Sequence, residues 1–258
     1  MKISVCGKGG SGKSTVVSLL ADAARARGVR TLVVDSDESN SGLFRMLGFA
    51  KPPEPLMTLV GGKEGIKEKM NQTTILSEAE IAMEQIPHPY IKKQNGLWLV
   101  SIGKILQALE GCACPMGALS REFLNKLHLA ENEIAFVDME AGIEHFGRGL
   151  DAGIDCVLLV VEPSYESLTL SEKIKGLAGQ MQKNIWGVLN KISSDLMAAN
   201  LEADLKKRQI ETIGVIPYDS SVFTACLEGN PIREGQAVRQ ARKIIDLVMS
   251  KTETKNRG

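Results

Sequence analysis

The chain has 258 residues, of which 43% are hydrophobic and 24% are charged, a composition typical of a soluble globular protein with a full core. Its 31 basic and 31 acidic residues balance, so its overall charge favours neither nucleic acid nor an anionic membrane as a partner. No apolar run approaches the ~18 residues that span a bilayer, and a glycine-rich motif begins at residue 7, which leaves no room for a signal sequence. We therefore expect a cytoplasmic protein whose five cysteines are core residues or ligands rather than a disulfide framework.

Short apolar runs alternate with helical patterns along the chain, which is typical of a mostly parallel sheet flanked by helices. The predicted strands, in chain order, are 2–6, 31–35, 97–101, 134–138, 156–162, 186–190 and 212–216. Apolar residues at i, i+3 and i+4 predict helices at 14–27, 120–127, 167–183 and 236–249. Prolines, glycines and charges interrupt any period at 51–95, so we expect an irregular insertion there, between the second and third strands. The prediction is one doubly wound α/β domain over residues 1–250, followed by a flexible polar tail at 251–258.

A glycine-rich motif lies between the first predicted strand and the first predicted helix. It reads GKGGSGKS from Gly7 to Ser14, a full match to the phosphate loop of P-loop NTPases. Its glycines allow backbone N–H groups to surround phosphate, and the following helix adds the positive end of its dipole. Lys13 is expected to reach the β- and γ-phosphates, Ser14 to bind Mg²⁺ and Thr15 to hold the α-phosphate. The residues expected to contact nucleotide here are Gly9, Gly10, Ser11, Gly12, Lys13, Ser14 and Thr15. The motif therefore predicts ATP or ADP with Mg²⁺ as the ligand, the alternative being a glycine-rich turn that contains lysine by chance.

A second lysine, Lys8, follows the first glycine, where an ordinary phosphate loop has no fixed requirement. The pattern KGGSGKS resembles the deviant Walker A ATPases, a group that includes the nitrogenase iron protein, MinD, ParA and the tail-anchor targeting ATPase. The resemblance implies a nucleotide-dependent homodimer in which Lys8 crosses the interface to the partner's phosphates. The alternative is a solvated loop lysine.

Two acidic segments follow predicted strands at their carboxyl ends, where ligands bind in open α/β sheets. In VVDSD, the resemblance implies that Asp37 positions or activates the attacking water. In DMEAG, it implies that Asp138 holds Mg²⁺ through water and that the Gly142 N–H senses the γ-phosphate. Both segments would then be switches that ATP orders, the alternative being that these carboxylates cap helices.

Two later strand ends fit a purine pocket. Asn190 and Pro217 each end or follow a predicted strand, and the resemblance implies that these positions contact adenine. The Asn side chain carries both a donor and an acceptor, which suits a base edge. An ordinary turn or cap residue is the alternative for Asn190.

The segment GCACP places Cys112 and Cys114 two residues apart. One such pair supplies two of the four ligands that a structural metal site needs. A second copy of the chain on a two-fold axis would supply the other two and complete a cage of four thiolates. The alternatives are buried cysteines beside a helix, or a redox thiol pair, although Cys-x-Cys is shorter than the usual redox spacing.

The CACP element, the run DMEAGIEH with GRG after it, and the tripeptide VEP together resemble the CooC-type nickel-insertion ATPases over nearly the whole chain. The resemblance implies an ATPase whose nucleotide-dependent homodimer binds Ni²⁺ or Zn²⁺ through Cys112 and Cys114. It further implies that the client is a nickel enzyme, carbon monoxide dehydrogenase. Glu38-Ser39 depart from the family, in which Pro followed by Asp or Asn is common. We interpret His145 as a residue that contacts its own chain rather than metal.

Other functions remain open. One is maturation of a different nickel or iron-sulfur enzyme, such as acetyl-CoA synthase. Another is a MinD- or ParA-like positioning ATPase, for which an amphipathic basic terminal helix or a basic stripe is expected. A third is an electron carrier that holds a [4Fe–4S] cluster between two subunits.

Overall fold

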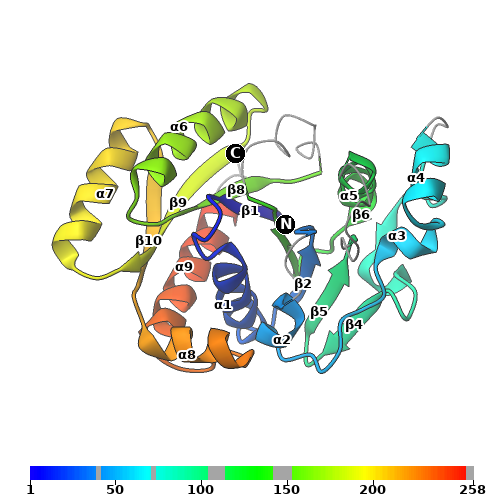
Figure 1. The fold of residues 1–258 in the computed structure, drawn as a ribbon, viewed down its shortest axis with the longest axis horizontal. Helices are drawn as coiled ribbons and strands as arrows, with labels where there is room; N and C mark the ends of the chain where they lie inside the picture. The colour runs from blue at the N-terminus through cyan, green and yellow to red at the C-terminus, as the bar shows by residue number, and fades with distance from the viewer. Residues whose placement is uncertain (39–41, 71–73, 104–113, 142–152, 254–258) are drawn as a thin grey trace.

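The computed structural model describes residues 1–258 apart from 39–41, 71–73, 104–113, 142–152 and 254–258 (Figure 1). Within these described residues, one sheet has eight strands in the order β10-β9-β8-β1-β7-β2-β5-β4. Its strands are β1 (Lys2–Gly7), β2 (Arg30–Asp35), β4 (Ile91–Gln94), β5 (Leu97–Ser101), β7 (Glu133–Asp138), β8 (Cys156–Val161), β9 (Asn184–Ile192) and β10 (Glu211–Pro217). Neighbouring strands run parallel except β4 and β5, which confirms the predicted mostly parallel sheet.

Strands that are covered on both faces read as continuous apolar runs, and the central strands of this sheet do so. Every residue of β7 and β8 is buried. The edge strand β4 reaches β5 through Asn95-Gly96, whose φ angles of 49° and 78° suit the tight turn of a two-residue hairpin. A separate short parallel pair joins β3 (Ile81–Ala82) to β6 (Leu127–His128).

Helices cover both faces of the sheet, and each face has its own apolar cluster beneath them. One cluster includes α1 and α9, which lie side by side in Figure 1, and the other includes α5, α6 and α7. The helices are α1 (Lys13–Arg25), α2 (Leu43–Met46), α3 (Leu56–Leu59), α4 (Gly62–Met70), α5 (Cys114–Lys126), α6 (Tyr165–Gln180), α7 (Asp195–Lys207), α8 (Ser220–Glu228) and α9 (Gln236–Glu253), with a 3₁₀ turn at Met83–Gln85. In the described parts of the chain, no helix has the length and apolar character needed to cross a bilayer.

The helix boundaries correct several expectations. α5 begins at Cys114 rather than at residue 120, because Pro115 lies in the first turn, where a missing N–H costs nothing. The segment 51–95, expected to be irregular, contains α3, α4, β3 and β4. α9 continues through Glu253, into the expected tail, and Lys251 Nζ lies 2.8 Å from Glu211 Oε1.

Candidate nucleotide-binding site

The phosphate loop leaves β1 at Gly7 and enters α1 at Lys13, as its motif predicts. Two glycines have backbone angles or contacts that other residues would not tolerate. A Cβ on Gly7 would lie 2.5 Å from the Val160 carbonyl oxygen of β8. Gly12 caps α1 in the left-handed region at φ 91°, and its Cβ would collide with the Asn190 side-chain amide. The loop is therefore closely packed against the ends of β8 and β9.

Polar atoms are buried in this loop in a manner that fits phosphate. The Lys13 side chain is almost fully buried, and its ammonium donates to the Lys8 carbonyl oxygen at 3.4 Å, a long contact. Ser11 is completely buried, and its hydroxyl has no hydrogen-bond partner among the described residues. Buried polar groups normally have partners, and phosphate oxygens would supply them here.

Ser14 and Asp138 meet beside the loop. The Ser14 hydroxyl donates to Asp138 Oδ2 at 2.6 Å, while the buried Oδ1 has no hydrogen-bond partner in the described structure. Asp138 has no exposed surface, and this burial raises its pKa to about 7. The charges of Asp35 and Asp37 raise the pKa further, whereas Ser14 and Lys13 oppose them. A hydroxyl, a carboxylate and an unsatisfied oxygen are the donor chemistry that Mg²⁺ prefers.

The first acidic segment lies against the second. Asp35 is paired in register with Asp138, and the Ser36 N–H donates to the Asp138 carbonyl oxygen at 3.0 Å. Asp37, two residues after Asp35, is also buried. A Cβ on Gly9 would lie 3.6 Å from the Ala141 Cβ, so the loop also approaches the fourth residue of the DMEAG segment. The structure thus brings the predicted residues Lys13, Ser14, Asp37 and Asp138 to one edge of the sheet.

Lys8 is bound within its own chain. Its ammonium lies 3.1 Å from Glu162 Oε1 and 3.9 Å from Glu166 Oε2. The other oxygen of Glu162 accepts from Lys191 Nζ at 2.9 Å, and Lys191 also donates to the Gly10 carbonyl oxygen. Burial opposes the charge of Glu162, but the two lysines outweigh it and hold its pKa below the usual range.

The predicted adenine contacts are at the ends of β9 and β10, on the same edge. Asn190 is buried, and its amide nitrogen donates to the Ser11 carbonyl oxygen at 2.8 Å. In the structure this side chain supports the phosphate loop. Pro217 ends β10, and Thr15 Oγ1 lies 3.8 Å from the thiol of Cys226 on α8.

Some predicted residues cannot be placed. Cys112, Gly142 and His145 lie outside the described residues, and Cys114 is described only as the first residue of α5. In contrast, the described structure reveals Glu162 and Lys191, to which the sequence analysis assigned no role. Their positions directly after β8 and near the end of β9, two strands close to the phosphate loop, were the available signal.

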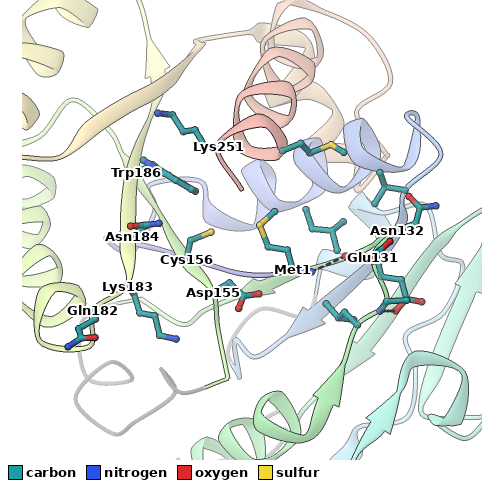
Figure 2. A pocket seen from close by; sticks show the side chains of 16 residues that line it. Met1, Glu131, Asn132, Asp155, Cys156, Gln182, Lys183, Asn184, Trp186 and Lys251 are labelled. Carbon is teal, nitrogen blue, oxygen red and sulfur yellow. Dashed lines mark hydrogen bonds between the residues drawn. The ribbon is translucent and has the colours of Figure 1, made fainter. Parts of the chain in front are cut away.

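A cavity of about 590 Å³ lies elsewhere in the molecule. Figure 2 shows the side chains that line it. Its lining includes Met1, Glu133, Cys156 and Asn184, which stand at the amino ends of β1, β7, β8 and β9. Because the strands are parallel, this cavity is at the opposite edge of the sheet from the phosphate loop. It is therefore separate from the nucleotide site.

The parallel sheet, the loop between β1 and α1, and the Ser14–Asp138 pair define a P-loop nucleotide-binding ATPase. The chain belongs to the CobQ/CobB/MinD/ParA nucleotide-binding domain family, whose model matches residues 3–232.

Relatives and solved structures agree with this class. The chain is 41% identical to an uncharacterised ATP-binding protein of Methanocaldococcus jannaschii, over 90% of this chain and 94% of the relative. It is 34% identical to the carbon monoxide dehydrogenase accessory protein CooC of Rhodospirillum rubrum, over 87% of this chain and 86% of CooC. The fold is similar to that of the septum site-determining protein MinD of Pyrococcus horikoshii, solved with Mg-ADP, with a TM-score of 0.73, 18% identity and 98% coverage of both chains.

Proposed function

We propose that this protein is an ATP-dependent metallochaperone that assists nickel insertion into carbon monoxide dehydrogenase. The observation that carries the proposal is the likeness to CooC, 34% identical over 87% of the chain, in a sequence that contains the Cys112-x-Cys114 pair. Maturation of another nickel or iron-sulfur enzyme, such as acetyl-CoA synthase, uses the same chemistry with a different client.

The nucleotide site would hydrolyse ATP to ADP and phosphate. Lys13 would bind the β- and γ-phosphates, and Ser14 and Asp138 would hold Mg²⁺, Asp138 through water. Bound Mg²⁺ would neutralise charge on the phosphates. Asp37 would position the attacking water, and Lys8 would contact the nucleotide of a second subunit. Asn190 and Pro217 would line the adenine pocket.

The metal site would form between two subunits. Each chain supplies two thiolates, and four thiolates around one ion suit Zn²⁺ or Ni²⁺. ATP binding would close the dimer and align both pairs, and hydrolysis would loosen them and release the metal. Thermodynamic linkage then requires two effects of equal size. Bound metal must strengthen ATP-driven association by the same factor by which association strengthens metal binding.

The terminal helix does not favour a membrane-positioning role. Ile244, Ile245 and Val248 of α9 are buried in the core against α1 and β10. The apolar face of α9 is therefore used inside the fold, whereas a membrane-binding helix presents its apolar face to lipid.

Replacing one cysteine tests the metal site. Cys112→Ser is expected to abolish stoichiometric uptake of Ni²⁺ or Zn²⁺ and to leave ATP affinity unchanged, because two of four thiolates are lost from each dimer. Metal content is measured with and without ATP, alongside the size of the protein in solution. Cys226→Ser, which changes an exposed thiol on α8, is the control and should retain the metal. Retention of one metal per dimer in Cys112→Ser would refute the shared site.

A further inference from the structure

Glu162 stands at a junction of the loop and two strands. It follows β8 directly, and its side chain is 15% exposed. Its backbone N–H donates to Ser167 Oγ at 3.2 Å, and Ser164 caps α6 through the Ser167 N–H. These contacts fix the backbone of Glu162 just before α6 begins at Tyr165.

Each carboxylate oxygen binds a different lysine. Oε1 accepts from Lys8 at 3.1 Å, and Oε2 accepts from Lys191 at 2.9 Å. Lys191 is tied to the phosphate loop through the Gly10 carbonyl oxygen, and its φ of 60° fixes an unusual backbone conformation for a lysine. Lys8 is 35% exposed, and among the described residues its ammonium has only Glu166, at 3.9 Å, as a second ion-pair partner.

We propose that Glu162 is a positioning residue that holds Lys8 within its own subunit and releases it to the partner's nucleotide when two subunits close. This inference rests on the proposed cross-subunit role of Lys8. The Lys8 ammonium cannot stay 3.1 Å from Glu162 and also bind phosphate on another chain, so the two states compete.

Lys191 makes this exchange reversible. A largely buried carboxylate that loses its only cation is strongly destabilised. Because Lys191 remains on Oε2, Glu162 keeps a partner after Lys8 departs. Lys191 therefore lowers the free-energy cost of releasing Lys8 from Glu162.

Two substitutions test the exchange, since they should shift association in opposite directions. Glu162→Gln frees Lys8 and should lower the protein concentration for half-maximal association by a factor of about five, the scale of a partly exposed ion pair. Lys191→Met leaves Lys8 as the cation on Glu162, and should raise that concentration. Sedimentation velocity with saturating Mg²⁺ and a non-hydrolysable ATP analogue measures both. Glu172→Gln, an exposed carboxylate on α6, is the matched control and should not change association.

A purely structural role for Glu162 gives another result, because both substitutions would then weaken association. That outcome, or no change in Glu162→Gln, overturns the inference while leaving the proposed function intact. If Glu162→Gln does not fold, Glu162→Asp withdraws the carboxylate by one methylene and should shift association in the same direction by a smaller factor. A wild-type chain that does not associate with the ATP analogue would overturn the proposed function itself.

Discussion

The pKa of the Asp138 carboxyl depends on the groups that surround it. It has no exposed surface, and its raised pKa of about 7 reflects burial first and the neighbouring acids second. Proton and Mg²⁺ would each relieve the same unfavourable charge, so they should compete for this carboxylate.

The stability of the protein in EDTA should therefore depend on pH through Asp138. The unfolded carboxyl titrates near 3.8 and the folded one near 7, so the folded state binds more protons between these values. The free energy of unfolding should fall as the pH rises through this window, by at most about 1.4 kcal/mol per pH unit. Asp138→Asn should lack this part of the slope. Urea unfolding of both proteins at several pH values measures it, and parallel curves would contradict the assignment.

Residues of the site differed in how far sequence could predict them. Lys13, Ser14 and Asp138 belong to motifs in which each position has a chemical role, and the structure brings them together. Glu162 and Lys191 are far apart in sequence, and only the adjacency of β8 and β9 makes them a pair.

At the scale of the elements, the carboxylate of Glu122 links α5 to the chain at residues 74–76. Glu122 accepts from the backbone N–H groups of Ile75 and Leu76 at 2.8–2.9 Å, from the Thr74 hydroxyl, and from Lys126 on its own helix. Burial opposes its charge, but these donors outweigh burial and lower its pKa to about 2. Glu122 thus fastens the chain at 74–76 to the helix that begins at Cys114.

Glu122→Gln should destabilise the protein by about 2 kcal/mol at pH 7, because a charged acceptor of several hydrogen bonds is lost. In the wild type this contribution is present above pH 4.5, the ordinary pKa, and is lost as the pH falls towards about 2. The free energy of unfolding of the variant should therefore fall less steeply over this acid range. Chemical unfolding between pH 2 and pH 7 checks this. Glu202→Gln, an exposed position on α7, should behave as wild type; an equal loss there would remove the explanation.

Sequence patterns predicted the buried elements and missed those that are largely exposed. The seven predicted strands are all present because central parallel strands are continuous apolar runs. The edge strand β4 was missed because half of its residues are exposed and polar. α8 has no buried residue and α7 buries only Leu201 and Leu205, so neither has a clear helical stripe.

At the scale of the whole molecule, the proposed cross-subunit role of Lys8 makes ATP hydrolysis depend on two chains rather than one. Lys8→Ala should bind ATP with normal affinity but should neither dimerise with ATP nor hydrolyse it, because it lacks the cation proposed to contact the second subunit's nucleotide. Calorimetric titration, sedimentation and phosphate release measure the three properties. Lys67→Ala, at an exposed position on α4, controls for loss of a surface charge. Unchanged turnover in Lys8→Ala would remove the cross-subunit role.

The strand order also bears on how such proteins diversify. Candidate nucleotide-site residues lie at the carboxyl ends of β10, β9, β8, β1, β7 and β2, which are consecutive in the sheet, whereas Cys112 follows β5 in the sequence, one strand further out. If the proposed metal site is correct, the residues that select the metal belong to the sequence between β5 and α5, and they can change without altering the strands that present the phosphate loop and its acids. Related ATPases can in this way differ in the ligand that they bind while keeping the same nucleotide site.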